Sequence, residues 1–430
     1  MIFTDYPAGP IKPLHGVNCA PYLKASGRRQ ELIERLFYDA KPPYCRLHDC
    51  CGNYGGSYFV DVPNIFRDFS ADENDPASYD FYYTDEYIAA LVKNGAQIVY
   101  RLGSSIEWGT KQYATNPPED FGKWARVCEH IILHYNEGWK DGFQYGIEYW
   151  EIWNEPENPP MWTGSKEQFF ALYATASRYL KEKFPALKIG GYGSCGFYSL
   201  TRPKPSDFQR SFVPYFTDFL AMCKREGCPL DFFSWHLYTQ DAAEIAANAR
   251  YVRKTLNAHG FQATESHLNE WNYADVNVGG FDKIATLTGA AFCASALITM
   301  QQEPVDLANY YDLNPASRYN GWIDLRTRQI TPVAYVFQAF AELFERRVQT
   351  RIRSERNEPA AIAAMTEGNL VALISNYGGK NVDVPLMIDT ARPCRIISLL
   401  ELTERGFVPA GFASRIPMAK DSVYLMRVVF

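Results

Sequence analysis

The sequence has no long apolar run and no strong excess of charge of either sign. No stretch of eighteen apolar residues occurs, so we expect no membrane-spanning segment and no membrane partner. The net charge is -6 and charged residues make up 21% of the chain, without any block of lysine and arginine. This balance argues against nucleic acid as a partner.

A secretory signal and a disulfide framework are also not apparent. The first residues, MIFTDYPAGPIKP, contain no basic segment followed by an apolar core, although a sequence trimmed of its signal would look the same. The ten cysteines follow no regular spacing, and several lie in apolar runs such as RVCEHIIL and AAFCASAL. Buried free thiols in a reducing compartment are favoured, and we expect a cytoplasmic location.

Aromatic residues, in contrast, are abundant. They form 15% of the chain, with 9 Trp and 29 Tyr. Such a content suits a pocket that stacks on flat, amphipathic ligands such as sugars. A large aromatic core explains the same composition, so composition alone does not separate the two interpretations.

Short apolar segments alternate with longer segments of helical spacing over most of the chain. Eight strands that each lead into a helix predict an α/β protein with a (β/α)8 barrel, the TIM barrel. The expected strands are 16–21, 44–49, 96–103, 148–154, 187–193, 230–238, 264–272 and 306–313. The expected helices are 28–40, 84–95, 121–136, 166–184, 212–227, 241–260, 283–300 and 332–347.

The pattern changes after about residue 345. Segments such as NLVALISNYG and SVYLMRVVF are short, apolar or alternating, and are separated by Gly, Pro, Asn and Asp. We interpret 346–430 as a smaller C-terminal all-β sandwich domain, following a catalytic barrel at 16–345. Residues 1–15 are expected to be able to add a strand to it.

Two glutamates lie where a TIM barrel carries its function, at the C-terminal ends of strands. Glu155 ends the fourth strand in YWEIWNEPEN, where Pro156 stops the ladder. Glu270 ends the seventh strand in HLNEWNY, whereas Glu265 begins that strand. A regular strand would also send Glu265 and Glu270 to opposite sides, so Glu270 is the better candidate.

Two carboxyl groups roughly 5 Å apart suit a retaining glycosidase. One carboxyl stays protonated and gives its proton to the leaving oxygen, while the other stays ionised and attacks the anomeric carbon. Asn154 is a candidate partner for a sugar 2-hydroxyl. The simpler interpretations are a rim acid near a turn for Glu155 and a structural acid for Glu270.

These motifs resemble those of one enzyme family. Asn154-Glu155-Pro156 resembles the acid/base motif of the clan A glycoside hydrolases, and HLNEWNY resembles the nucleophile strand of glycoside hydrolase family 39, which holds β-xylosidases and α-L-iduronidases. The resemblance implies that Glu155 is the acid/base and Glu270 the nucleophile.

The resemblance continues in other strands, from about residue 16 to 345. DFFSWHLYT resembles the sixth strand of the family, which implies that His236 and Tyr238 lie in the site, and YCRLHD resembles the second, which implies a sugar-binding position for His48. Tyr238 is expected to donate a hydrogen bond to Glu270. His236 is expected to position a substrate hydroxyl or the acid/base; a buried, satisfied histidine is the alternative. Arg46 shares a face with His48 and is a candidate partner for buried carboxylates.

The loop after the eighth strand departs from the family pattern. It reads YYDLNPASRYNG, in which Asp312 is the only acid and Tyr311 stands where the family usually has Trp. Both remain candidates for binding the sugar, and the departures bear on which sugar is chosen. Trp108, Trp271 and Trp322 are candidate stacking platforms, each of which also suits the core or rim.

Other tempting signals fail in context. GYGSCG (191–196) fits a dinucleotide motif but opens no helix. His130 and His134 have zinc-like spacing without a visible third ligand. The cluster Cys45, His48, Cys50 and Cys51 is a poor tetrahedral cage. We expect no metal and no cofactor.

The sequence thus predicts a retaining glycoside hydrolase, β-xylosidase-like, acting on oligosaccharides or glycosides. A related glycosidase for an arabinopyranoside, galactoside or uronide is the nearest alternative. A catalytically inactive carbohydrate-binding barrel and an interaction scaffold built on a barrel are the other classes. A homo-oligomer is compatible with the resemblance, but no sequence feature demonstrates one.

Overall fold

The fold is described from a computed structural model of the chain. It describes residues 1–20, 28–50, 58–107, 110–274, 279–314, 317–324, 327, 329–352, 359–385, 387–390, 393, 395–411 and 415–430.

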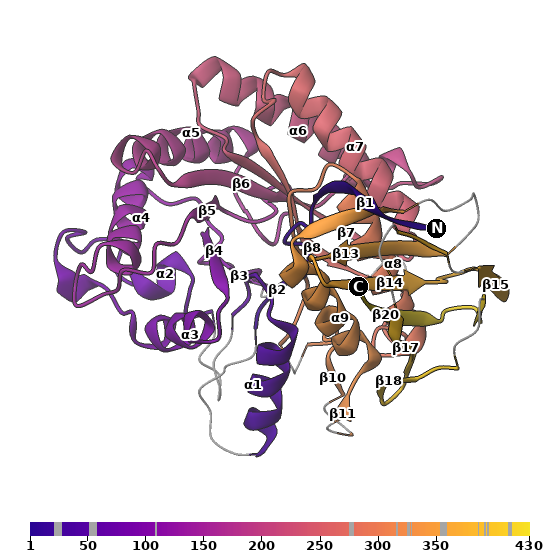
Figure 1. Cartoon of the computed structure of the whole chain (residues 1–430). Coiled ribbons are helices and arrows are strands. Elements are labelled where there is room, and N and C mark those ends of the chain that lie inside the picture. The colour runs from indigo at the N-terminus through magenta and orange to yellow at the C-terminus, as the bar shows by residue number, and fades with distance from the viewer. Residues whose placement is uncertain are drawn as a thin grey trace.

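Eight parallel strands close into a barrel in chain order, which confirms the predicted fold class. Seven of the predicted strands contain one of them, the predicted strand 187–193 ends one residue before β6 does, and the last strand pairs with the first, β9 with β2. In Figure 1 the barrel occupies the indigo-to-salmon part of the chain. The strands are β2 (Gly16–Asn18), β3 (Tyr44–Leu47), β4 (Gln97–Leu102), β5 (Tyr149–Ile152), β6 (Lys188–Ser194), β7 (Phe232–Tyr238), β8 (Glu265–Asn272) and β9 (Leu307–Tyr310).

A helix follows each barrel strand along the chain. These helices are α1 (Arg28–Ala40), α3 (Tyr82–Lys93), α4 (Phe121–Asn136), α5 (Lys166–Lys183), α6 (Asp207–Glu226), α7 (Ala242–Ala258), α8 (Leu287–Gln302) and α9 (Pro332–Arg346). Ser165 and Ser206 begin α5 and α6 with capping boxes, in which the serine side chain and a glutamine three residues later satisfy each other's backbone N–H groups. The short elements are α2 (Val62–Ile65), η2 (Pro76–Ser78), η3 (Tyr198–Leu200), β10 (Ile323–Asp324) and β11 (Gln329–Ile330).

Alternation along the barrel strands separates two environments. Val99, Tyr149, Phe232 and Leu307, from four different strands, form a small cluster apart from the main core, with Tyr44 packed against it. Their chain neighbours Ile98, Trp150, Phe233 and Ala308 belong to the main core. Because successive side chains of a strand point to opposite faces, the small cluster fills the barrel interior and the main core lies between strands and helices.

The chain after the barrel forms an all-β unit, as predicted. Its main sheet has eight strands in the order β16-β1-β12-β13-β14-β20-β17-β18, and β15 and β19 form a separate antiparallel pair. The N-terminal strand β1 pairs with β12 and β16, so the indigo start of the chain lies among the orange and yellow strands (Figure 1). The strands are β1 (Ile2–Pro10), β12 (Val348–Ile352), β13 (Ala360–Met365), β14 (Asn369–Ser375), β15 (Val382–Pro385), β16 (Ile388–Asp389), β17 (Arg395–Thr403), β18 (Gly406–Pro409), β19 (Arg415–Met418) and β20 (Val423–Val429).

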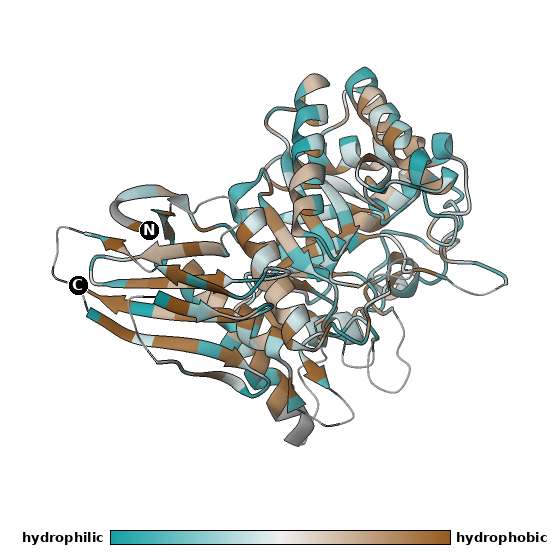
Figure 2. Cartoon of the chain, turned by 90° about the vertical axis from the view of Figure 1, so that its right-hand side faces the viewer, coloured by the Kyte–Doolittle hydropathy of each residue, from teal (hydrophilic) through white to brown (hydrophobic). Residues whose placement is uncertain are grey.

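Both faces of this sheet are apolar, and different elements pack against each of them. Along β14, Val371 and Leu373 join the core shared with the barrel helices, whereas Leu370, Ala372 and Ile374 join a second cluster that includes Ile416 and Met418 of β19. The strands of the sheet are accordingly largely brown in Figure 2. The β15–β19 pair therefore covers one face and helices α8 and α9 the other, which fixes the sheet beside the barrel. Within the described part of the chain, no helix is long and apolar enough to cross a membrane.

Candidate active site

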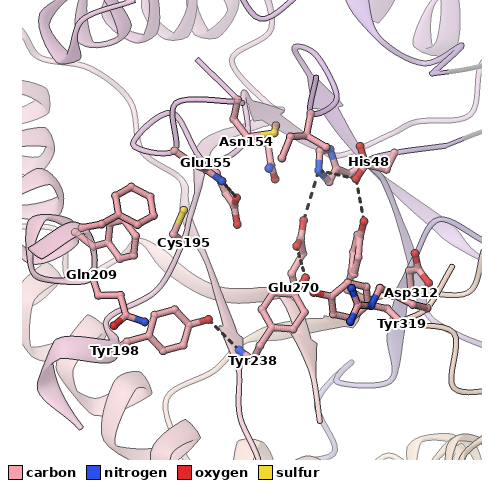
Figure 3. Close-up of a pocket in the computed structure, with 18 of the residues that line it drawn as sticks. His48, Asn154, Glu155, Cys195, Tyr198, Gln209, Tyr238, Glu270, Asp312 and Tyr319 are labelled. Carbon is pink, nitrogen blue, oxygen red and sulfur yellow. Dashed lines mark hydrogen bonds and ion pairs between the residues drawn. The ribbon is translucent and has the colours of Figure 1, made fainter. Parts of the chain in front are cut away.

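A cavity of about 1160 Å³ opens at the C-terminal end of the barrel strands. Its lining includes seven of the predicted site residues, which come from five barrel strands or the loops that follow them: His48, Asn154, Glu155, Tyr238, Glu270, Tyr311 and Asp312. Figure 3 shows Glu155 and Glu270 facing the same space from different strands. His236 is fully buried and does not line the cavity, but it contacts both glutamates from behind.

The turn after β5 places Glu155 in a strained backbone. Trp153 and Glu155 have φ values of +70° and +46°, in the left-handed region that non-glycine residues rarely adopt. The N–H of Trp153 donates to the carbonyl of Leu102, and that of Glu155 donates to the carbonyl of Gly193 at 3.0 Å. These bonds from both neighbouring strands hold the turn, so the Glu155 side chain is directed by the barrel itself.

The Glu155 carboxylate is paired with a histidine. Its Oε1 lies 2.7 Å from Nδ1 of His236, and its Oε2 accepts a hydrogen bond from Asn158 at 3.0 Å. Burial favours the neutral acid, but the hydrogen bond and charge of His236, with Asn158, outweigh it and lower the pKa of Glu155. Burial likewise opposes the imidazolium, but Glu270 and Glu155 raise the pKa of His236. Both shifts favour the ion pair, in which His236 carries the proton and Glu155 is ionised.

The Glu270 carboxylate is held by donors instead. Arg46 Nη1 donates to its Oε1 at 2.8 Å, and the Tyr238 hydroxyl donates to its Oε2 at 2.7 Å, which is the contact expected for Tyr238. Nε2 of His48 lies 3.7 Å from the same Oε1. An arginine and a phenol thus each donate a hydrogen bond to a different oxygen of this carboxylate.

The register of β8 explains how Glu270 reaches the cavity. Leu268 pairs with Trp235, but Glu270 pairs with His236, so Asn269 is an extra residue in this ladder. The expectation that Glu265 and Glu270 point to opposite sides is therefore wrong. Glu265 accepts a hydrogen bond from Tyr149 in the barrel interior at 3.0 Å, and the bulge turns Glu270 to the same interior side.

Arg46 is the centre of a buried network beneath the cavity. The guanidinium bonds Glu151 at 2.6 Å, Glu270 at 2.8 Å and Asn154 at 2.6 Å, and its side chain has no exposed surface. Glu151 is also fully buried and accepts from Ser234 and Asn269. A Cβ at position 193 would lie 3.0 Å from Asn154 Oδ1, so Gly193 permits this close approach.

The two glutamates lie at the separation that retaining chemistry needs. One oxygen of Glu155, one of Glu270 and a nitrogen of His236 all lie within 4.8 Å of one another. Among the described residues this is the group whose ligand atoms are close enough to hold a metal ion. The Arg46 cation already neutralises Glu270, and His236 already bonds Glu155, so the donor set fits a metal poorly.

A polar wall lies beside Glu270. The Tyr311 hydroxyl donates to Asp49 at 2.8 Å, and Nε2 of His48 lies 3.4 Å from Asp49. Burial and the nearby Glu270 charge raise the pKa of Asp49 to about 6, and burial also raises the pKa of Asp312. Oδ1 of Asp312 and Nδ1 of His48 are buried and lack a hydrogen-bond partner among the described residues. Such atoms are suited to sugar hydroxyls.

Trp271 and Trp322 do not line the cavity. Trp322 is buried against Phe337 of α9, with ring centroids 5.1 Å apart, and Trp271 stacks on the same ring from β8. Both are core residues in the structure, not stacking platforms. Trp108 and Cys51 lie outside the described residues.

The rejected motifs also have structural roles. His134 bonds Asp85 at 2.9 Å and the carbonyl of Trp139 at 2.8 Å, and His130 bonds the carbonyl of Arg126. The segment GYGSCG lies mostly within β6 and leads into the single turn η3. The two histidines are thus bonded within the protein, and GYGSCG does not open a long helix as a dinucleotide-binding motif would.

Several residues of the site were not singled out from the sequence. Glu157 accepts hydrogen bonds from Ser194 and the backbone of Cys195, and burial, with Glu155 nearby, raises its pKa to about 7. Phe208 and Phe212 line the cavity from the first turns of α6. The α6 pattern predicted a start at 212, but the Ser206–Gln209 capping box is the sequence signal that places the start at Asp207.

The barrel and its pair of glutamates define the class of protein, a glycoside hydrolase on a (β/α)8 barrel. Residues 53–311, more than half of the chain, match the sequence profile of the family described as Glycosyl hydrolases family 39. The chain belongs to this family, which confirms the resemblance and the prediction of a glycosidase.

Known relatives agree with this assignment. A β-xylosidase of Geobacillus stearothermophilus is 27% identical over 258 residues, which are 52% of this chain and 47% of that protein. A β-xylosidase of Caldicellulosiruptor saccharolyticus is 24% identical over 367 residues, covering 77% and 70% of the two chains. The match thus spans about half the length of the first relative. The crystal structure of a glucosidase from Croceicoccus marinus superposes with a TM-score of 0.75 at 23% identity, covering 99% of this chain and 97% of that one, which shows the shared fold.

Proposed function

We propose that the protein hydrolyses glycosidic bonds with retention of configuration, with Glu270 as the nucleophile and Glu155 as the acid/base. The observation that carries this proposal is the close pair of glutamates with unlike partners. Glu270 accepts hydrogen bonds from Arg46 and Tyr238, whereas Glu155 is paired with His236, a group that can supply it with a proton. Two carboxyl groups with such different partners suit opposite roles.

The reaction follows from these positions in two displacements. The Glu270 carboxylate attacks the anomeric carbon, the bond to the leaving oxygen breaks, and Glu155 gives that oxygen its proton. Water then attacks the same carbon, Glu155 takes the proton of the water, and Glu270 is released as a carboxylate. His236, 2.7 Å from Glu155, is placed to supply this proton through Glu155 in the first step and to take it back in the second.

The sugar is bound by the polar wall beside Glu270. We assign sugar contacts to Asn154, His48, Tyr311 and Asp312, which line this part of the cavity. A β-xyloside is the first expectation, because both curated relatives named above are β-xylosidases. Glucosides, galactosides, arabinopyranosides and uronides are the sugars to compare with it.

The test is turnover of a panel of nitrophenyl glycosides that carry these sugars. Wild-type protein is compared with Glu270→Ala, with Glu155→Ala in the presence of azide, and with Glu148→Ala as the matched control, since Glu148 is a half-exposed glutamate immediately before β5. We expect loss of turnover in Glu270→Ala, rescue of Glu155→Ala by azide as a glycosyl azide of retained configuration, and little change in Glu148→Ala. Sugar binding without turnover of any glycoside would support an inactive carbohydrate-binding barrel instead.

Location and assembly follow as further parts of the proposal. The eight cysteines of the described chain, Cys19, Cys45, Cys50, Cys128, Cys195, Cys223, Cys228 and Cys293, are all buried and free, which supports a reducing compartment such as the cytoplasm. Cell fractionation tests this location. A homo-oligomer stays a prediction, and light scattering of the purified protein tests it.

A further inference from the structure

The cavity extends well past the two glutamates on the side away from the polar wall. In Figure 3, Glu155 lies between Glu270, with His48 and Asp312 beyond it, and a second group that includes Cys195, Tyr198 and Gln209. The volume of about 1160 Å³ exceeds what one sugar ring fills. The proposed mechanism gives this second half of the cavity no role.

Part of this second half, which we call the α6 wall, presents apolar side chains. It consists of Met161, Tyr198, Pro203, Phe208 and Phe212. The two phenylalanines are four residues apart on α6 and therefore share one face of the helix, with ring centroids 4.8 Å apart at 78°. Phe212 is 2% exposed, but Phe208 is 46% exposed. The ring of Phe208 is thus exposed at the cavity and packs against the buried ring of Phe212.

Several polar side chains of this half are already bonded to the protein, whereas Lys204, which also lines it, is exposed. Ser206 and Gln209 satisfy each other's backbone N–H groups in the capping box of α6. Arg202 donates to the carbonyl of Tyr238 at 2.7 Å and lies 3.3 Å from Glu244, and Asn158 donates to Glu155. A ligand rich in hydroxyl groups would gain no hydrogen bonds from the apolar side chains of this half, whereas an apolar group would bury its surface against them.

The order of the reaction assigns this half to the leaving group. The anomeric carbon must face Glu270 and the leaving oxygen must face Glu155, so whatever is attached to that oxygen extends beyond Glu155, toward the α6 wall. The sugar itself then occupies the polar wall beside Glu270. The polar wall therefore contacts the sugar, and the α6 wall contacts the leaving group.

We propose that the α6 wall is a binding site for an apolar aglycone, so that the enzyme prefers aryl or medium-chain alkyl glycosides over oligosaccharides. This inference rests on the proposed function and names its substrate class. Contact with Phe208 and Met161 removes apolar surface of the aglycone from water, and each added methylene that is buried strengthens binding. Because the aglycone stays in place at the transition state, the gain appears in kcat/KM.

The experiment compares methyl and octyl glycosides of the sugar and anomer that the nitrophenyl panel identifies, with the disaccharide of that sugar beside them. Simple alkyl alcohols are similar leaving groups, so their kcat/KM values differ by aglycone binding. We expect the octyl glycoside to exceed the methyl glycoside by about tenfold or more, and to exceed the disaccharide. Phe208→Ala should lower the octyl-to-methyl ratio by roughly three- to tenfold and leave the methyl value within about twofold.

Tyr82→Ala is the matched control, because Tyr82 is an aromatic residue 66% exposed that lies on α3 and does not line the cavity. A second measurement needs no variant. Octanol and glucose are offered to the wild-type enzyme as acceptors for the glycosyl group, in competition with water. The acceptor hydroxyl attacks the anomeric carbon, Glu155 takes its proton and Glu270 is released. Because the α6 wall should bind octanol better than glucose, the alkyl glycoside should form in preference to the disaccharide.

An octyl-to-methyl ratio near one, a better disaccharide, or an unchanged ratio in Phe208→Ala would overturn the proposed aglycone site. These results leave the proposed function standing as long as Glu270→Ala abolishes turnover of the methyl glycoside. Turnover that is equal in wild type and Glu270→Ala would instead refute the catalytic assignment. The two failures are therefore distinguishable in one set of assays.

Discussion

Replacing Arg46 by methionine tests how much the buried guanidinium beneath the cavity contributes to stability and to turnover. Arg46 and Glu151 are without exposed surface, and the Glu270 side chain is 5% exposed. Arg46→Met leaves Glu151 buried without its cation, and leaves Glu270 with His236, 3.4 Å from its Oε2, in place of the guanidinium. Breaking a buried pair in this way costs about 3–5 kcal/mol of the free energy of unfolding.

A second substitution separates charge from packing. Adding Glu151→Gln to Arg46→Met removes the uncompensated charge of Glu151, so the double variant should be more stable than Arg46→Met alone by about 1–3 kcal/mol. Turnover should not return, because Glu270 still lacks the donor to its Oε1. We expect kcat/KM to stay at least about a hundredfold below wild type in both variants.

Urea unfolding followed by tryptophan fluorescence measures the stabilities, and nitrophenyl glycoside turnover measures activity. Arg250→Met is the control, since Arg250 forms an ion pair with Glu303 at the surface and is 69% exposed. That pair should contribute less than about 1 kcal/mol. The reasoning is refuted if Arg46→Met costs no more than Arg250→Met, or if Glu151→Gln destabilises the Arg46→Met protein further.

Three further outcomes follow from the site and its surroundings. Burial raises the pKa of Glu157 from 4.5 to about 7, so the folded protein keeps a proton that the unfolded chain releases between these pH values. The resulting contribution to the free energy of unfolding, up to about 3 kcal/mol, is complete below pH 4.5 and is lost as pH rises through 7. In urea unfolding, Glu157→Gln should flatten this pH dependence. Equal pH profiles of the variant and the wild type would contradict the assignment. Tyr238→Phe removes the hydrogen bond to Glu270 and should lower kcat/KM by roughly ten- to hundredfold, with an unchanged value as the contrary result. Trp322→Phe should lower stability by about 1–3 kcal/mol through lost packing on Phe337 and leave KM unchanged, whereas a raised KM would make Trp322 a sugar contact after all.

Periodicity was sufficient to predict the barrel. Each of the eight apolar segments coincides with a barrel strand to within a few residues, because a strand buried on both faces leaves a short apolar run bounded by turn residues. The ends are less readable: the first segment was expected at 16–21, but ladder pairing ends at Asn18. The start of α6 was missed by five residues because its first turn carries little apolar periodicity, and Phe208 was missed with it.

The site residues were predictable where the position of a residue on a strand determines whether its side chain points into the cavity. Glu155 and Tyr238 belong to strands or turns whose ends are marked by sequence motifs, and both line the cavity. Glu270 reaches the cavity through a bulge at Asn269, which strand parity cannot reveal. The partners of Arg46 depend on the register of several strands, so the sequence indicated a buried cation but not the carboxylates that it binds.

The assignment of Glu270 as the nucleophile is the central claim, and trapping the covalent intermediate tests it most directly. A 2-deoxy-2-fluoro glycoside with a good leaving group slows both displacements, so the glycosyl-enzyme accumulates and peptide mass spectrometry locates the sugar. The account predicts one added glycosyl group per chain, on the peptide that contains Glu270, and slower labelling in Glu155→Ala unless the leaving group needs no proton. A label on another residue, or steady hydrolysis with inverted configuration and no label, would contradict it.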